Sequence, residues 1–82
     1  MKVEILTPEK IVFEGEVEVL TVPTRSGLIS VMSNHASLVS AVEAGEIRMK
    51  TKDGERVFEC ERGVIETMNN KTHLLLRKCM EK

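Results

Sequence analysis

The stretch "EIRMKTKDGERVFECE", residues 46–61, decides the fold class because it joins two alternating runs through a turn signal. In the first run the apolar Ile47 and Met49 alternate with charged residues, which is the period-2 pattern of a strand with one solvated face. Asp53-Gly54 then supplies the positive φ that a tight type I′ turn requires. The second run returns with the same alternation and places Phe58 on one face. The stretch therefore predicts an antiparallel β-hairpin.

Proline and glycine divide the N-terminal part of the chain into further short strands. Residues 2–6 alternate, and Pro8 ends that run because its ring fixes φ and disfavours a helical residue before it. Residues 10–23 are rich in β-branched side chains and end at Pro23. Gly15 lies inside this extended segment, where it predicts a kink or bulge.

The middle and C-terminal parts follow the same plan. A polar turn at "TRSG" (24–27) precedes the apolar strand "LISVM" (28–32). The segment "ASLVSAV" (36–42) fits either one helical turn or a strand, and its short length favours a strand. A further turn is expected at "NNK" (69–71). Structural turn or bulge positions are expected at Pro8, Gly15, Gly27, Gly45, Gly54 and Gly63.

Turn signals that recur every eight to twelve residues or so predict an all-β protein. The expected architecture is a flattened antiparallel β-sandwich or small barrel of about eight to ten short strands. Residues 1–82 form a single domain in this interpretation. A chain of this length buries only about 60% of the surface that its unfolded form exposes, so we expect it to be marginally stable alone.

Composition argues against several classes of partner. The chain has two Phe, no Trp or Tyr, and a net charge of −1, so neither a stacking platform nor a basic surface for nucleic acid is expected. No run approaches the roughly 18 apolar residues of a membrane span, and Glu4 and Pro8 interrupt the start where a signal peptide needs an apolar stretch. Cys60 and Cys79 are not in CxxC spacing, so reduced thiols are favoured, although one bridge is possible in principle.

No arrangement of residues predicts catalysis or metal binding. His35 lies between Ser33 and Ser37, but a nucleophile also needs a third group that orients the base, and no GxSxG elbow is present. A zinc site would need ligands from dispersed positions that follow none of the usual spacings, namely His35, His73, Cys60 and Cys79. The isolated glycines form no phosphate loop. We therefore expect no catalytic residue, no cofactor, no metal and no small-molecule substrate.

One alternative function is a biotinyl- or lipoyl-type carrier, which would carry its prosthetic group on Lys50 near the predicted hairpin. In such carriers the modified lysine occupies the turn itself, whereas Lys50 lies in the strand before it. A solvated strand lysine is the favoured interpretation. A generic protein-binding β-domain is the other alternative.

Three segments together resemble the N-terminal β-sandwich domain of the epsilon subunit of F-type ATP synthase. The first is "ILTPEKIVFEGEVEVLTVP" (5–23). The second begins at Gly27 and continues through "HASL" (35–38) to Gly45, which is similar to the family's Gly…His-Ala-Pro-Leu…Gly pattern. The third is "RGVIETMNNKTHLL" (62–75), which resembles the closing hairpin of the family. The resemblance spans nearly the whole chain in order.

This resemblance implies a non-catalytic central-stalk subunit that links the gamma subunit to the c-ring, so that ring rotation is coupled to ATP synthesis. The chain would then be a peripheral protein on the cytoplasmic face of the inner or plasma membrane. His35 would lie at the contact with the polar loops of the c-ring, with residues 28–30 beside it, and residues 37–40 would lead into the gamma-facing region. The implied partner-binding residues are Leu28, Ile29, Ser30, Asn34, His35, Ala36, Ser37, Leu38 and Ser40.

The chain departs from the family pattern in three places. Where the family usually has Pro-Gly-His-Ala-Pro, this chain has "SNHAS" (33–37), and Asn34 is expected to adopt the left-handed conformation in place of glycine. Leu28 replaces an acidic residue, which predicts an apolar contact with the c-ring. The chain stops at "LLLRKCMEK" (74–82), before the helical hairpin of many family members, so we expect it to lack the inhibitory and nucleotide-sensing activities of that hairpin.

Overall fold

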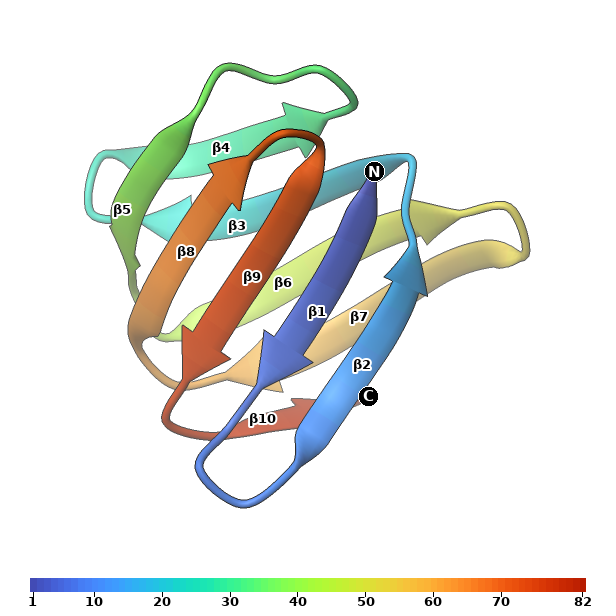
Figure 1. Cartoon of the computed structure of the whole chain (residues 1–82). Coiled ribbons are helices and arrows are strands. Elements are labelled where there is room, and N and C mark those ends of the chain that lie inside the picture. The colour runs from blue at the N-terminus through green and yellow to red at the C-terminus, as the bar shows by residue number, and fades with distance from the viewer.

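The computed structural model describes residues 1–82 and consists of ten strands with no helix (Figure 1). The strands are β1 Lys2–Leu6, β2 Ile11–Glu16, β3 Val19–Thr24, β4 Gly27–Met32, β5 Leu38–Val42, β6 Gly45–Thr51, β7 Gly54–Cys60, β8 Gly63–Met68, β9 Lys71–Leu76 and β10 Cys79–Glu81. The predicted all-β class and the strand in residues 36–42 are thereby confirmed. The structure has no helix that is both long enough and apolar enough to cross a membrane.

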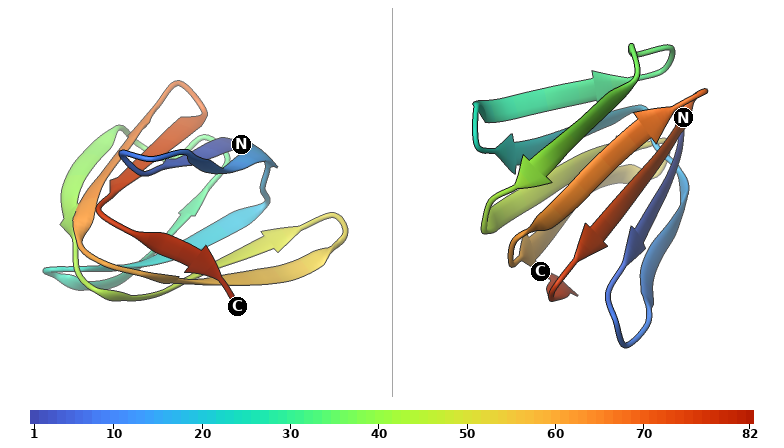
Figure 2. Two further views of the ribbon diagram at one scale, coloured as in Figure 1. Left: turned by 90° about the horizontal axis from the view of Figure 1, so that it is seen from below. Right: turned by 60° about the vertical axis from the view of Figure 1, so that its left-hand side comes forward.

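The strands form two facing layers that share one continuous hydrogen-bonded sheet (Figures 1 and 2). One layer has the order β5-β8-β9-β1-β2, and the other has the order β10-β7-β6-β3 with β4 on the far edge of β3. The layers join where Thr24 of β3 pairs with Val42 of β5. The result is the nearly closed sandwich expected from the sequence.

The pairing of β1 with β9 corrects the expectation of a purely antiparallel fold. These strands run parallel, with Lys2 opposite Lys71 and Leu6 opposite Leu75, whereas every other pair is antiparallel. Antiparallel order follows wherever consecutive strands are joined by a tight turn. β1 and β9 are distant in the sequence and are not constrained by such a turn.

The core lies between the two layers and is built from alternate residues of the strands. It contains 17 buried apolar side chains, including Val3 and Ile5 from β1 and Ile47 and Met49 from β6. Phe13 of β2 and Phe58 of β7 meet across the sandwich edge-to-face, with ring centroids 6.0 Å apart and an interplanar angle of 70°. These two rings join the layers where the sheet does not close.

Gly15 does not form the predicted kink or bulge. It pairs in regular register with Val3, and the register shift falls earlier, where Leu6 pairs with Ile11 after Ile5 has paired with Phe13. A Cβ at Gly15 would lie 3.2 Å from the tip of the Phe13 ring, so glycine leaves room for that ring.

The turn between β6 and β7 also differs from the expectation. Only Gly54 has a positive φ, of 119°, so the turn is not type I′. Instead the Thr51 hydroxyl accepts a hydrogen bond from the Asp53 amide at 3.1 Å and donates one to the Gly54 carbonyl at 2.9 Å. Residues 24–27 repeat this arrangement with another threonine and another glycine. The type I′ geometry occurs at the turn between β8 and β9, where Asn69 and Asn70 have φ values of 52° and 64°.

Candidate partner-binding surface

β4 is an edge strand whose outer side is open. It pairs only with β3, and Leu28 stands opposite Pro23. The Pro23 carbonyl accepts a hydrogen bond from the Glu43 amide at 2.9 Å, so the backbone groups of Pro23 point away from β4. Because backbone groups alternate in direction along an antiparallel ladder, those of Leu28 and Ser30 point away from β3. β4 therefore presents unpaired amide and carbonyl groups at the edge of the sheet.

The open edge of β4 lacks the features that usually prevent strands from adding to a sheet. Its sequence "GLISVM" contains no charged residue and no proline, and its register with β3 is regular. The other edge strands are protected: β2 has an irregular register and glutamates at Glu14 and Glu16, and β10 has only three residues. Unprotected edges are sites where another chain can bind.

The side chains of β4 alternate between the core and the surface. Val31 is fully buried, and Ile29 is half-buried against the core. Leu28 and Met32 lie on the outer face and are 72% and 53% exposed. Between them the Ser30 hydroxyl lies 3.2 Å from that of Thr21. The apolar "LISVM" run thus supplies both core and an exposed apolar surface.

The loop that carries His35 has a defined conformation. Asn34 has a φ of 65°, so it adopts the left-handed conformation expected where the family pattern has glycine. Its amide donates to the Asn70 side-chain oxygen at 2.8 Å, and the His35 amide donates to the Met32 carbonyl at 3.1 Å. The N-terminal ammonium of Met1 donates to the Ser33 hydroxyl at 3.3 Å. Sequence reasoning missed Asn70 and Met1 as supports, because neither is close to the loop in the chain.

The His35 ring is oriented by its own loop. Its Nδ1 lies 2.8 Å from the Ala36 carbonyl oxygen, which can only accept a hydrogen bond. Nδ1 therefore carries the proton, and in the neutral ring Nε2 is a free acceptor on an exposed side chain. The Ser33 hydroxyl accepts from the N-terminus instead of contacting this ring. The His35 ring therefore presents a free hydrogen-bond acceptor to solvent.

The residues proposed for partner binding form a strip and not a compact cluster. Leu28 lies near the start of β4, and His35 follows three residues after Met32, the last residue of the strand. Leu38 and Ser40 lie on β5 in the other layer and are half-buried. Val39 between them is 70% exposed, and sequence reasoning missed both it and Met32. The period-2 alternation of each strand is the signal that could have identified them.

A second apolar surface crosses the outer face of the layer that contains β1. We call it the apolar row; the strand registers align its members across five strands as Ala41, Val64, Leu75, Leu6 and Ile11. Leu75 and Ile11 are 53% and 59% exposed, and Val64 is 42% exposed. Sequence reasoning missed this row, because its members come from distant segments and single exposed apolar residues are common.

His73 lies on the same face, in a shallow hollow lined by Lys2, Glu4, Lys71, Thr72 and His73 itself. Its Nδ1 is 3.0 Å from the Glu4 carboxylate. The hydroxyl of the adjacent Thr72 points inward and donates to Thr67 at 2.9 Å. The structure therefore gives this histidine a hydrogen-bond partner and directs the adjacent hydroxyl into the core.

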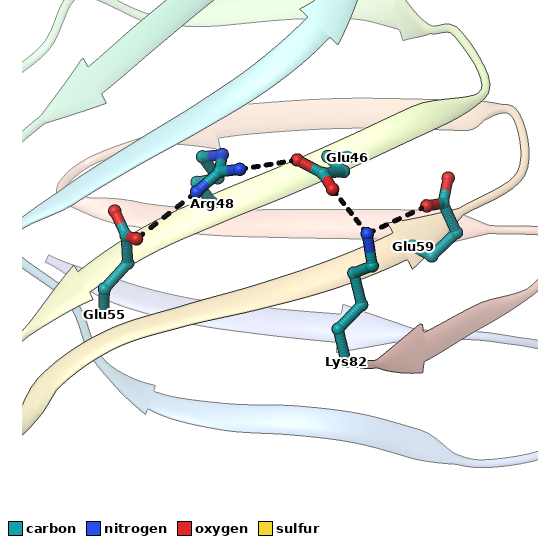
Figure 3. A network of polar contacts seen from close by, with 5 residues as sticks. All are labelled: Glu46, Arg48, Glu55, Glu59 and Lys82. Atoms are coloured by element: carbon teal, nitrogen blue, oxygen red, sulfur yellow. Dashed lines mark hydrogen bonds and ion pairs between the residues drawn. The ribbon is translucent and has the colours of Figure 1, made fainter.

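The layer that contains β6 and β7 has a charged outer face (Figure 3). Arg48 bridges Glu46 at 2.8 Å and Glu55 at 3.3 Å, and Lys82 bridges Glu46 at 2.6 Å and Glu59 at 3.6 Å. The hydrogen bonds from Lys82 and then from Arg48 lower the pKa of Glu46. These charged side chains form ion pairs with one another at the solvent-exposed surface, whereas the exposed apolar side chains along β4 have no such partners.

The positions of the remaining candidates are clear. Lys50 lies within β6, opposite Val19 on one side and Glu55 on the other, and does not occupy the turn. This is the solvated strand position that the sequence favoured, and it gives no support to a carrier domain. Cys60 and Cys79, for which the sequence favoured reduced thiols and left one bridge possible in principle, lie directly opposite each other on β7 and β10 as free thiols.

A family profile described as "ATP synthase, Delta/Epsilon chain, beta-sandwich domain" matches residues 1–82. The chain belongs to this family. The ATP synthase epsilon chain of Endomicrobium trichonymphae is 38% identical over 74 residues, which cover 90% of this chain and 54% of the relative. The epsilon chain of Chlorobium limicola is 39% identical over 75 residues, which cover 90% of this chain and 85% of the relative. The chain thus spans about half the length of the first relative and most of the second.

Two solved structures contain chains with the same fold. A chain in the cryo-EM structure of Euglena gracilis mitochondrial ATP synthase, OSCP/F1/c-ring, matches with a TM-score of 0.90 at 13% identity, over 96% of this chain and 51% of that chain. A chain in the Tetrahymena thermophila mitochondrial ATP synthase central stalk/c-ring structure matches with a TM-score of 0.77 at 16% identity, over 96% and 64%. At these identities the likeness shows the fold alone.

Proposed function

We propose that this chain is a non-catalytic central-stalk subunit of a proton-translocating F-type ATP synthase. It links the gamma subunit to the c-ring, so that ring rotation is coupled to ATP synthesis in the other subunits. The observation that carries the proposal is the match of the delta/epsilon β-sandwich family to all of residues 1–82. The relatives are named ATP synthase epsilon chains, which supports the same role.

A linker between two bodies needs two separate contact surfaces, and the fold offers two exposed apolar ones. We assign the β4 edge with the His35 loop to the c-ring, because Leu28 and the free His35 Nε2 suit a contact with polar loops that have an apolar component. We assign the apolar row to gamma, because it is a broad, regular face supported by five strands. In this position the chain is a peripheral protein on the cytoplasmic face of the inner or plasma membrane.

Rigidity suits this role. A shaft component transmits torque only if its body does not deform. The two-layer sheet is closed on one side by the β3–β5 pairing and is packed around a core of 17 buried residues. Its loops are short, and the longest, residues 33–37, is held by Asn70 and by the N-terminus. The fold therefore provides a stiff spacer.

Substitution at the β4 edge tests the c-ring assignment. Leu28→Asp and His35→Asp place carboxylates on the proposed contact, and each should reduce co-purification of the c-ring with the tagged chain and lower proton-driven ATP synthesis in membranes. Met80→Asp is the matched control, because Met80 is 73% exposed, compared with 72% for Leu28, and lies on β10 away from both proposed surfaces. Normal assembly and coupling in both β4-edge variants would reject this surface.

A further inference from the structure

The two cysteines form a cross-strand pair that the sequence does not reveal. In the antiparallel ladder between β7 and β10, Cys79 is directly opposite Cys60. Both side chains are buried in the sandwich, and both thiols are free. They are separated in sequence by the whole β8–β9 hairpin, so only the tertiary fold brings them together.

The flanking backbone hydrogen bonds determine the type of this pair. The Glu61 amide donates to the Lys78 carbonyl, and the Lys82 amide donates to the Val57 carbonyl, each at 2.9 Å. Hydrogen-bonded pairs alternate with non-hydrogen-bonded pairs along an antiparallel ladder. The Cys60–Cys79 pair is therefore of the non-hydrogen-bonded type, for which Cα atoms are about 4.5 Å apart. This separation falls within the range of roughly 4.4–6.8 Å that a disulfide spans, so a bond can close without moving the strands.

The thiols interact with each other. Their shared hydrogen bond lowers the pKa of Cys79, because the Cys60 S–H donates to the Cys79 thiolate. The same hydrogen bond and burial raise the pKa of Cys60, which would have to ionise beside an existing negative charge. Cys79 lies on the short edge strand β10, and we take it as the attacking thiol.

A small reagent has a route to this pair. A hollow of about 500 Å³ is lined by both cysteines together with Ala44, Lys78, Met80 and Lys82, among others. β10 has only three residues and lies at the edge of the sheet, and short edge strands open more readily than the core.

We infer that Cys60 and Cys79 form a redox-active dithiol site, which a small-molecule disulfide converts into an intramolecular disulfide that joins β10 to β7. In the first step the Cys79 thiolate attacks one sulfur of the reagent, the reagent S–S bond breaks, and one reagent thiolate leaves and takes up a proton. In the second step the Cys60 sulfur, giving up its proton to solvent, attacks the Cys79 sulfur and releases the second reagent thiol. The protein loses two electrons and two protons, and the reagent is reduced to two thiols.

The disulfide would stabilise the folded state by restricting the conformations of the unfolded chain. It closes the loop between residues 60 and 79, which reduces the conformational freedom of the unfolded state, while the native strands already hold the correct separation. The effect should be largest on β10, which can then no longer detach from β7.

The test uses the purified chain equilibrated with oxidised glutathione under native conditions. Intact mass should fall by two hydrogens, both thiols should become resistant to alkylation, and the melting temperature should rise by on the order of 10 °C, reversed by a reductant. Retention of both alkylatable thiols, or disulfide-linked dimers as the main product, would overturn the inference.

Single-cysteine variants supply the controls. Cys60→Ala leaves the proposed nucleophile alone, so this variant should stop at a mixed disulfide with one glutathione and show no comparable gain in melting temperature. Cys79→Ala should likewise stop at a mixed disulfide with one glutathione, because an intramolecular bond needs both sulfurs. Equal gains in melting temperature for the wild type and Cys60→Ala would show that the stabilisation does not come from a Cys60–Cys79 bond.

Discussion

At the scale of single residues, Gly63 is required by a close contact that a sequence pattern does not show. A Cβ at Gly63 would overlap the Leu75 carbonyl oxygen and lie 2.8 Å from the Leu76 Cα, both of which are backbone atoms of β9. The sequence predicts a turn or bulge at Gly63. The actual cause is the close approach of β8 and β9, which depends on their pairing.

Replacing Gly63 with alanine should therefore destabilise the protein. Because backbone atoms cannot move aside as easily as a side-chain tip, we expect Gly63→Ala to lower the free energy of unfolding by roughly 1–3 kcal/mol. Gly15→Ala is the matched control: its Cβ would meet only the tip of the Phe13 ring, at 3.2 Å. Urea unfolding of both variants is the measurement. A smaller loss for Gly63→Ala than for Gly15→Ala would contradict the steric explanation.

A second prediction at this scale concerns Asn70, whose side-chain oxygen accepts the Asn34 amide at 2.8 Å. Asn70→Gly keeps the left-handed backbone available but removes this acceptor, so hydrogen exchange at the Asn34 amide should accelerate. Asn69→Gly is the control, since Asn69 shares the positive φ but does not accept this bond. If both variants accelerate exchange equally, the effect comes from the turn backbone and not from the bond.

At the scale of elements, the hairpins were predictable and the long-range pairings were not. Alternation and turn residues identify the β6–β7 hairpin, and they identify β5 as a strand, because these signals are local. The parallel pairing of β1 with β9 and the Cys60–Cys79 pair depend on which strands become neighbours across the whole chain. The exposed residues proposed for partner binding were partly predictable. Assigning Met32 of β4 and Val39 of β5 to the surface required knowing which alternate residues of each strand point outward.

The charge network across β6, β7 and the C-terminus makes a prediction about pH. Lys82, and then Arg48, lower the pKa of Glu46 by hydrogen bonding to its carboxylate. A carboxyl whose pKa is lowered on folding stabilises the fold above its unfolded pKa, and that contribution is lost as the pH falls through the folded value. Lys82→Met should therefore raise the pKa of Glu46 toward its ordinary value in an NMR titration. Lys50→Met serves as the control, because Lys50 makes no ion pair with Glu46; a pKa that does not respond to Lys82→Met would exclude the pairing in solution.

At the scale of the whole molecule, the fold has one outer surface whose charged side chains pair with one another and other surfaces whose exposed groups have no partners. The outer face of β6 and β7 is covered by mutual ion pairs, whereas the β4 edge and the apolar row expose side chains and backbone groups without partners. A small domain of this kind gains stability by binding, because a partner that binds only the folded state shifts the folding equilibrium. The proposed position in the central stalk explains this difference, because the c-ring and the gamma subunit would cover the β4 edge and the apolar row.

The most direct test of this account is photo-crosslinking from position 35 within the assembled membrane complex. A photoreactive amino acid replaces His35, and the crosslinked peptides are identified by mass spectrometry, with the same amino acid at Glu59 on the charged face as the control. The account predicts crosslinks from position 35 to the polar loop of the c subunit and none to it from position 59. Crosslinks from position 35 only to other proteins, or equal crosslinking to the c subunit from both positions, would contradict it.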